Sequence, residues 1–414
     1  MPFKKLLLFS LFMSFITIGI LEGFLLLICK ISPKINLILS RSYTGAAIDD
    51  EVLRYRPNPA YIEHDAKGFR NKSVPKKVEI VCIGDSQTYG MGIGVPPEDA
   101  WPQQLDNISG RTTYNMAFAG YGPTQYLYLL DEAIAMKPRG IIVGFYAGND
   151  LYDVFCMVYK KNKCADLKNA DIRVINAIDE LENEGALLSV IENNSPQRQE
   201  RIFKNKSVRR TITSLFKIIP DYSKIFGIFR ALGRLTVNNR TLGVVADFFQ
   251  HPFSPAGAVY DNGKFRTIFS VRERLLVLNL NDTRISESFR IALESLRLMR
   301  EKALKNDIAF YVLLIPTKEL VFKDLVYRDW ETIPGDYKAL IENEENLFAQ
   351  TKSYLSGHSI AYFEALPSLR ESLRNGKQPY SVTKDGHPNI IGYYAIAQLI
   401  SDSLTYDKVM SGGK

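Results

Sequence analysis

The chain has 414 residues, 46% of them hydrophobic and 23% charged, and these proportions exclude a protein that is disordered throughout. The formal net charge of +7 comes mainly from residues 200–240, which hold ten basic and two acidic residues. The remainder is close to neutral and has no zinc-finger or RNP-like pattern, which argues against nucleic acid as a partner.

The chain begins with an apolar segment. Residues 6–29 read LLLFSLFMSFITIGILEGFLLLIC, with Glu22 as the only charged residue. A helix of this length can cross a bilayer core of about 30 Å, so we expect a transmembrane anchor over residues 1–30. A cleaved signal peptide is the alternative, but no small-x-small cleavage site follows the segment. Glu22 is expected near a membrane interface or against a partner helix.

The basic residues on the two sides of this segment give almost no preference for its orientation. The amino terminus and two lysines precede it, and three basic residues follow it. They are Lys4 and Lys5 before the segment, and Lys30, Lys34 and Arg41 after it.

Residues 31–75 have a mixed composition and contain Arg-Pro-Asn-Pro at 56–59, which is typical of a stalk or lead-in segment. Residues 78–83 are apolar and the run stops at Gly84, as a buried parallel strand does. Cys82 lies in this run, so we expect it to be a buried free thiol.

Two later apolar runs, residues 140–146 and 308–315, have the same character. Helical patterns precede them at about 124–136 and 288–305. Strands that alternate with helices predict an α/β fold, a three-layer α/β/α sandwich around a parallel sheet. The expected organisation is an anchor (1–30), a stalk and lead-in (31–75), the first part of the sandwich (76–150), an insertion (151–285), its second part (286–405) and a tail (406–414).

The insertion, residues 151–285, is expected to be a mainly helical subdomain, because the alternation of strands and helices stops there. Its Cys156 and Cys164 either close a small disulfide in an oxidising compartment or stay free thiols, since spacing alone does not fix disulfide geometry. The basic stretch 200–240 also contains many apolar residues. It either lies against anionic lipid headgroups as an amphipathic segment or packs its apolar side on the rest of the protein.

The first motif is Gly84-Asp85-Ser86, directly after a predicted strand. Ligands bind outside the carboxyl ends of the strands in an open parallel sheet, so Ser86 lies where chemistry is expected. A helix that begins here would turn its amide groups and the positive end of its dipole toward an anion. Taken alone, the motif also fits a strand-ending turn with a helix-capping serine.

Two further motifs offer hydrogen-bond donors. One is NMAFAGYG at 115–122, which contains Gly120, and the other is Gly148-Asn149-Asp150, again just after a predicted strand. A glycine lets a backbone N–H approach a ligand closely, and an asparagine amide is a donor that cannot lose its proton. Together they could form an oxyanion hole, although each alone also fits a turn glycine or an Asx cap.

The fourth motif, Asp385-Gly386-His387-Pro388-Asn389, contains one of the four histidines of the chain. An imidazole two residues from a carboxylate and next to a proline suits an oriented base. The sequence has no HExxH motif and no Cys/His cluster, so we expect neither a metal nor another cofactor.

In order and rough placement, these four blocks resemble those of the SGNH/GDSL hydrolase superfamily, over about residues 65–150 and 286–403. The chain also resembles the membrane-anchored bacterial branch of that superfamily. The features that carry this second resemblance are Gly68-Phe69-Arg70, GDSQTYGMGIG at 84–94, Trp101, GYGPTQ at 120–125 and Ile315-Pro316-Thr317-Lys318-Glu319. The resemblance implies a flavodoxin-like sheet and a catalytic domain outside the cytoplasm, on the periplasmic side of an inner membrane.

The resemblance further implies that Ser86 is the nucleophile and that its own N–H contributes to an oxyanion hole. The other two donors would be the backbone N–H of Gly120 and the side-chain amide of Asn149. His387 would act as general base and then as general acid, with Asp385 orienting it. The residues implied to support these groups are Asp85, Gly148 and Asp150.

One position departs from the most familiar pattern of the superfamily. That pattern has an aspartate three residues before the histidine, and Lys384 stands there in this chain. Asp385, two residues before His387, matches a D-x-H variant instead. The role of Asp385 is therefore the least supported of the implied roles.

The implied activity is hydrolysis of O-acyl groups, such as acetyl groups on carbohydrate or lipid, through an acyl-Ser86 intermediate. Transfer of the acyl group to envelope polysaccharide is one alternative, and a non-catalytic membrane-anchored scaffold is another. A scaffold has no need of Ser86, Gly120, Asn149 and His387 together, which favours the enzyme. The expected partners are the membrane, through the N-terminal helix, and an ester-bearing small molecule, glycan or lipid. The oligomeric state is left open.

Overall fold

The computed structural model describes residues 3–31, 45–184, 228 and 258–411. These residues divide into two compact units. One unit contains residues 3–31, 45, 46 and 228, and the other contains residues 47–184 and 258–411.

The first unit is dominated by helix α1, Phe3–Ile31. Among the described residues, this is the one helix that is long and apolar enough to cross a membrane, with a candidate span over Phe12–Ile31. Leu25 and Cys29 on α1 pack against Ile228. The predicted apolar helix is therefore present. Its length and composition fit a retained membrane anchor and a cleaved signal sequence equally.

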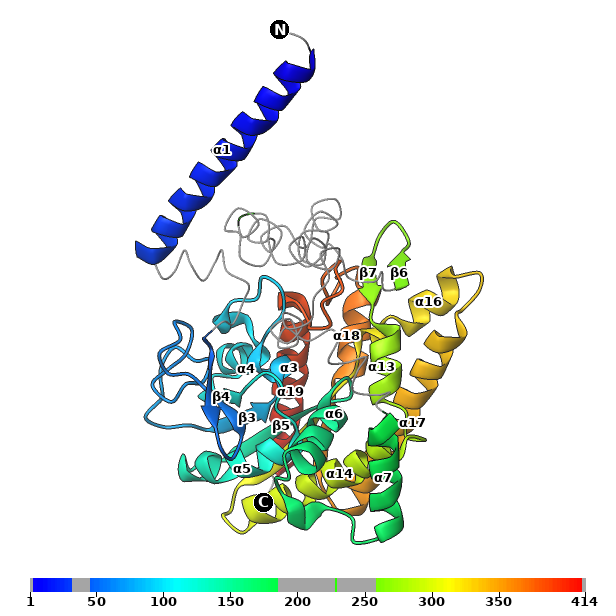
Figure 1. Ribbon diagram of the computed structural model, residues 1–414. Coiled ribbons are helices and arrows are strands. Elements are labelled where there is room, and N and C mark those ends of the chain that lie inside the picture. The colour runs from blue at the N-terminus through cyan, green and yellow to red at the C-terminus, as the bar shows by residue number, and fades with distance from the viewer. Residues whose placement is uncertain (1–2, 32–44, 185–227, 229–257, 412–414) are drawn as a thin grey trace. The chain divides into compact units, whose positions relative to one another are not determined.

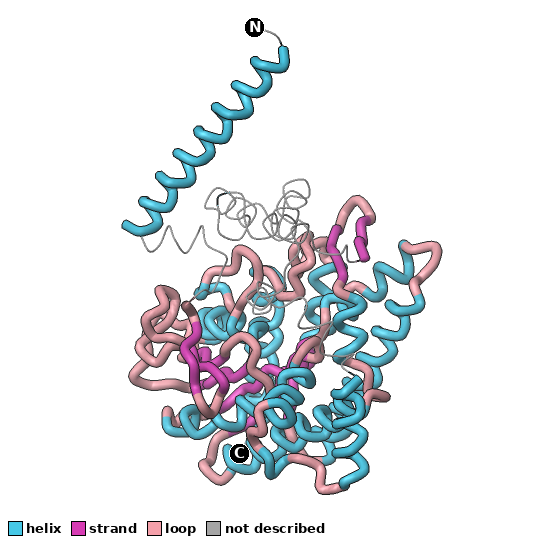
Figure 2. The backbone as a smooth tube through the Cα atoms, viewed as in Figure 1, coloured by secondary structure: helices cyan, strands magenta, loops and turns pink. Residues whose placement is uncertain are grey.

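The second unit is built on a five-stranded sheet (Figures 1 and 2). All neighbouring strands are parallel and their order is β4-β3-β5-β8-β9. Counted along the chain this is the order 2-1-3-4-5 of flavodoxin-like sheets, so the predicted α/β fold is confirmed. The strands are β3 (Ile80–Gly84), β4 (Thr113–Ala117), β5 (Gly140–Tyr146), β8 (Ala309–Ile315) and β9 (Ala361–Glu364).

Helices cover both faces of this sheet (Figure 1). One group packs together as α4 (Trp101–Ser109), α18 (Ala365–Arg374) and α19 (Ile390–Ser411). The other group is α5 (Pro123–Ala135), α6 (Asp150–Phe155), α14 (Thr283–Leu304) and α17 (Gly335–Gly357). Every residue of β3 and β5 is buried, because these strands lie between two helical layers, and this explains their uninterrupted apolar sequence.

Two short antiparallel hairpins complete the second unit. One joins β1 (Ala47–Asp50) to β2 (Arg54–Pro57), inside the segment predicted as a stalk. The other joins β6 (Ala258–Asp261) to β7 (Arg266–Phe269) and leads into α13 (Val271–Val277), inside the predicted insertion. The remaining short elements are α3 (Ser86–Tyr89), a 3₁₀ turn at Pro97–Asp99, a π-helical turn at Cys156–Lys160, a 3₁₀ turn at Ala165–Leu167, α7 (Ile172–Glu184), α15 (Lys318–Val321) and α16 (Lys323–Asp329).

The described parts of residues 151–285 are mostly helical, with one hairpin. The basic stretch 200–240 lies outside the described residues apart from Ile228, so neither interpretation of it is tested. None of the four cysteines forms a disulfide, and Cys29 and Cys82 are buried. For Cys156 and Cys164 the structure therefore agrees with the alternative without a disulfide.

Candidate active site

The carboxyl ends of β3, β4 and β5 lie side by side in the sheet. From β3 the chain moves to one neighbour, β4, and then crosses to the other, β5, so the β3/β5 junction is the topological switch point where α/β proteins bind ligands. Ser86 follows β3 and Asn149 follows β5, while Gly120 follows β4. The fold thus brings three separate sequence motifs to one edge of the sheet.

Ser86 is the half-buried residue in an otherwise buried stretch from 81 to 90. Asp85 caps α3, with its carboxylate accepting the N–H of Gln87 at 2.9 Å. The helix that begins at Ser86 is only four residues long. The expectation that a full helix dipole acts on an anion here is therefore wrong. What the turn offers is the individual N–H of Ser86, which donates to no other group among the described residues.

Two glycines make room for the turn that carries Ser86. Thr88 on α3 is fully buried and packs against both β3 and β5. A Cβ on Gly84 would lie 2.2 Å from the Thr88 hydroxyl oxygen, and one on Gly144 would lie 2.3 Å from it. Both distances are far below van der Waals contact, so any larger residue at these positions would displace Thr88. Because Thr88 and Ser86 are both on α3, Ser86 would move with it.

His387 joins Ser86 and Asp385 through its two ring nitrogens. Nε2 lies 2.9 Å from Ser86 Oγ, and Nδ1 lies 2.6 Å from Asp385 Oδ1. The same carboxylate accepts the backbone N–H groups of His387 at 3.1 Å and of Ile93 at 2.9 Å. Lys384 instead pairs with Glu273 at 3.0 Å. Among these neighbours it is therefore Asp385, and not the side chain at position 384, that contacts the imidazole.

The surroundings keep Asp385 ionised. Burial alone would raise its pKa, but the charge of His387 and hydrogen bonds from His387 and Ile93 lower the pKa below the ordinary 3.8. Asp85 behaves differently: burial raises its pKa to about 6, against hydrogen bonds from Gln87, Asn149 and Ser86. The carboxylate beside the imidazole is thus the one that stays negative throughout the neutral range.

Two cations hold the loops that carry these groups. The buried ammonium of Lys318 donates to the backbone carbonyls of Thr383 and Asp385, both at 2.9 Å. Arg274 on α13 donates to the carbonyl of Gly148, next to Asn149. Its Nη2 also lies 3.0 Å from the point where a Cβ on Gly386 would be.

Arg274 therefore touches both the loop after β5 and the loop before His387. Sequence reasoning assigned no role to Arg274 or to Lys318. Their partners are backbone carbonyls, which every residue has, so the sequence does not show which carbonyls they bind. Arg274 also lies in the segment that was interpreted as a separate insertion.

The candidate oxyanion donors differ in their present partners. Within the described residues, the N–H of Gly120 donates to no other group. The Asn149 amide donates to Asp153 Oδ2 at 2.6 Å and also bonds to the Asp85 carboxylate, so both of its N–H groups face carboxylates in this structure. Burial raises the pKa of Asp153 well above its ordinary value, while the bond from Asn149 lowers it.

Gly148 and Asp150 shape the loop after β5. A Cβ on Gly148 would lie 2.4 Å from a ring carbon of Tyr146, so any other residue at position 148 would clash with the tyrosine ring. The Asp150 carboxylate accepts the N–H of Tyr146 at 2.9 Å and the hydroxyl of Tyr126 at 3.1 Å. These contacts fix the loop on which Asn149 stands. Among the described residues, no group of three or more His, Cys, Asp or Glu side chains could hold a metal ion.

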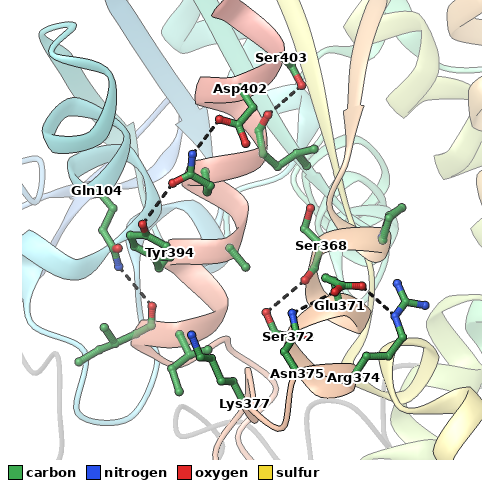
Figure 3. A pocket seen from close by; sticks show the side chains of 16 residues that line it. Gln104, Ser368, Glu371, Ser372, Arg374, Asn375, Lys377, Tyr394, Asp402 and Ser403 are labelled. Carbon is green, nitrogen blue, oxygen red and sulfur yellow. Dashed lines mark hydrogen bonds and ion pairs between the residues drawn. The ribbon is translucent and has the colours of Figure 1, made fainter.

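A groove of about 860 Å³ lies between α18 and α19 (Figure 3). It is separate from Ser86, Asp385 and His387, none of which lines it. Many of its polar side chains bond to neighbours on the same helix: Tyr394 bonds to Gln398, Gln398 to Asp402, and Arg374 to Glu371. The groove does not contribute to the chemistry of the site.

No protein-family model matches the sequence, and no curated protein matches it. Among solved structures, a protein assigned to the G-D-S-L lipolytic family from Desulfitobacterium hafniense DCB-2 is 13% identical, with 79% of this chain and 99% of that chain covered and a TM-score of 0.34. A GDSL-like lipase from Bacteroides thetaiotaomicron VPI-5482 is 11% identical, with coverages of 81% and 92% and a TM-score of 0.33.

A carbohydrate esterase family 2 enzyme with a carbohydrate binding domain, from Corynascus thermopiles (Myceliophthora fergusii), is 11% identical over 85% of this chain and 75% of that chain, with a TM-score of 0.33. Similarity at this level does not identify a family.

Proposed function

We propose that this chain is a serine esterase or acyl hydrolase of the SGNH/GDSL type that acts through an acyl-Ser86 intermediate. The observation that carries the proposal is the continuous hydrogen-bonded chain from Ser86 Oγ through both ring nitrogens of His387 to Asp385. A nucleophile within hydrogen-bond reach of a base, and a base held by a third group, is the arrangement that activates a serine hydroxyl.

The first half-reaction follows from this geometry. With its Nδ1–H donated to Asp385, the imidazole accepts the Ser86 proton at Nε2 while Oγ bonds to the ester carbonyl carbon. The carbonyl oxygen gains the negative charge and is stabilised by the N–H groups of Ser86, Gly120 and the Asn149 amide. When the tetrahedral intermediate collapses, the ester C–O bond breaks and the leaving alcohol takes the proton from Nε2. The acyl group stays on Ser86.

The second half-reaction repeats these steps with another hydroxyl compound. Water, or a sugar hydroxyl, gives its proton to Nε2 as its oxygen bonds to the acyl carbon, and Ser86 Oγ leaves with that proton. Hydrolysis and transfer to carbohydrate therefore use the same residues. Turnover of short and long acyl esters, with and without oligosaccharide acceptors, would identify both the acyl length and the acceptor.

The proposal is tested by labelling with a fluorophosphonate, which reacts with an activated serine. We expect the full-length protein to be labelled, Ser86→Ala to lose all labelling, and a matched control, Ser109→Ala, to keep it. Ser109 is a half-buried serine on α4 that donates to the carbonyl of Leu105. Labelling that persists in Ser86→Ala would refute the assignment, and absence of labelling in the wild type would favour the scaffold.

We also propose that α1 remains as a single membrane anchor with the second unit outside the cytoplasm, on the periplasmic side. Lys4 and Lys5 at the start of α1 support this orientation, although Lys30 lies in its last turn and Lys34 and Arg41 follow it. Cys156 and Cys164 form no disulfide, which is compatible with either side of the membrane. A reporter active only outside the cytoplasm, fused after Lys414, should be active, and an inactive reporter would reverse the orientation.

A further inference from the structure

The donor at Gly120 lies in a tight turn. The N–H of Tyr121 donates to the carbonyl of Phe118 at 3.3 Å, which closes a four-residue β-turn. Gly120, the third residue, has φ +73°, while Ala119, the second, is not among the residues with positive φ. Positive φ at the third position alone defines a type II turn, which favours glycine there.

In such a turn, one peptide unit decides where the Gly120 N–H points. This unit contains the Ala119 carbonyl and the Gly120 N–H, and because a peptide is planar and trans, these two groups point in opposite directions. Type I and type II turns differ mainly by a rotation of this unit through about 180°. Whatever holds the Ala119 carbonyl therefore also aims the Gly120 N–H.

Tyr55 on β2 is the group that holds this carbonyl. Its hydroxyl lies 3.0 Å from the carbonyl oxygens of both Ala119 and Gly120. A Cβ on Gly120 would lie only 2.3 Å from that hydroxyl oxygen, so the contact also requires glycine at position 120. Burial raises the pKa of Tyr55, which keeps its hydroxyl protonated and able to donate at neutral pH.

Tyr55 is itself firmly placed. Its ring stacks on Tyr121, with centroids 5.7 Å apart, and meets the edge of Phe118 at 5.9 Å. The Tyr121 hydroxyl donates in return to the backbone carbonyl of Tyr55 at 2.7 Å. The β1–β2 hairpin and the turn at 118–121 therefore support one another through reciprocal bonds.

We propose that Tyr55 is a positioning residue for the oxyanion hole, which holds the Ala119–Gly120 peptide in the orientation that presents the Gly120 N–H to the reacting carbonyl oxygen. The inference rests on the proposed function, and it adds a residue from outside all four motif blocks. A bond accepted by the carbonyl also polarises the N–H at the other end of the same peptide, which makes it a better donor.

The test compares Tyr55→Phe with Tyr337→Phe in the full-length protein. The second variant also loses a tyrosine hydroxyl that donates to a backbone carbonyl, that of Glu319 at 2.7 Å, but away from the turn. We expect Tyr55→Phe to lower kcat for a short acyl ester by about tenfold, the usual effect of one hydrogen bond, with KM within twofold. Tyr337→Phe should keep kcat, while both variants show similar small losses of thermal stability.

A second readout separates positioning from general structural support. Affinity for a boronic acid, which forms a tetrahedral anion on the serine, should fall in Tyr55→Phe, while affinity for a neutral alcohol product should not. Replacing Tyr55 by 3-fluorotyrosine retains the ring and a more acidic hydroxyl, so kcat should be at least that of the wild type. This variant keeps the proposal testable if Tyr55→Phe does not fold.

The inference is overturned if Tyr55→Phe keeps the wild-type kcat and boronate affinity, or if it weakens the boronate and the alcohol equally. Failure of the proposed function has a different signature, because it appears first in the wild type, as a protein that the phosphonate does not label at Ser86.

Discussion

Lys384 and Asp385 are neighbours in sequence with opposite surroundings. The Lys384 ammonium pairs with Glu273 at 3.0 Å, whereas Asp385 contacts Nδ1 of His387 at 2.6 Å. The D-x-H spacing therefore suffices to bring a carboxylate to the imidazole. The aspartate expected three residues before the histidine is not needed for this contact.

The contact predicts a graded loss of activity. Asp385→Asn should lower kcat for a short ester by about 10²–10³-fold, because the amide no longer favours the tautomer with a proton on Nδ1, and His387→Ala should lower it further. Lys384→Gln is the control and should change kcat less than twofold, since the Lys384 ammonium pairs with Glu273 and does not hold the imidazole. Wild-type turnover in Asp385→Asn would mean that another group orients His387.

A buried acid behind the site makes stability depend on pH. Glu344 is fully buried and accepts the backbone N–H of Thr317 at 2.7 Å. Burial raises its pKa from 4.5 to about 8, against hydrogen bonds from Thr317. The folded protein thus binds this proton more tightly than the unfolded chain does. The free energy of unfolding should fall as pH rises from about 4.5 to about 8, by a few kcal/mol at most.

Glu344→Gln should remove most of this decline, since its amide is neutral at every pH. Urea unfolding at a series of pH values would measure the slope. Glu345→Gln is the matched control, because Glu345 is exposed and pairs with Lys323. Equal slopes in the wild type and Glu344→Gln would show that Glu344 does not bind the proton.

At the residue scale, the sequence identified the candidate catalytic groups and missed the side chains that hold their loops. Ser86, Asn149 and His387 were found because each follows a recognisable strand or precedes a proline. Tyr55, Arg274 and Lys318 act on backbone carbonyls, and any tyrosine, arginine or lysine can do so. Their positions depend on the tertiary fold, which a single sequence does not state.

At the element scale, the strands with long apolar runs were predicted and the short ones were not. β3 and β5 are buried throughout, β8 is buried over its last four residues, and all three have apolar sequences. β4 has the sequence TYNMA and β9 has AYFE, and both lie at the edges of the sheet. Short edge strands carry little hydrophobic pattern, so the five-strand order could not be derived from periodicity.

The contact of β3, β5 and α3 gives a prediction for Gly144. Gly144→Ala should lower the free energy of unfolding by about 1–3 kcal/mol through overpacking against Thr88, and should slow phosphonate labelling because α3 carries Ser86. Adding Thr88→Ala should restore much of both. Gly140→Ala on the same strand is the control, because its Cβ would meet nothing closer than 3.7 Å. If Gly144→Ala changed neither the free energy of unfolding nor the labelling rate, α3 would have to shift without cost.

The lead-in segment contains structure that its composition did not indicate. Arg-Pro-Asn-Pro at 56–59 indicated a stalk, yet residues 54–57 form β2, and Tyr55 on this strand contacts the turn at 118–121. Prolines end strands as readily as they stiffen linkers. β1 and β2 are close in sequence, but the turn that Tyr55 on β2 contacts lies more than sixty residues further along the chain.

At the scale of the whole molecule, the unit that holds the candidate site begins at Ala47. Removing residues 1–31 should therefore move the protein from the membrane to the soluble fraction and leave phosphonate labelling per molecule unchanged. Fractionation and labelling measure the two effects. A truncated protein that stays in the membrane would place the anchor elsewhere. The mass of the mature wild-type chain distinguishes a retained helix from a cleaved signal peptide.

Ser86 and His387 are hydrogen-bonded across 301 positions of sequence. A loop of this size closes late, because its ends meet only after the intervening sheet has assembled. During refolding from urea, circular dichroism should recover before the chain can react with a brief pulse of phosphonate. Simultaneous recovery would mean that the two ends meet early. The order matters for synthesis as well: because His387 lies 301 positions after Ser86, the nascent chain would carry a serine that cannot attack esters until that histidine has been made.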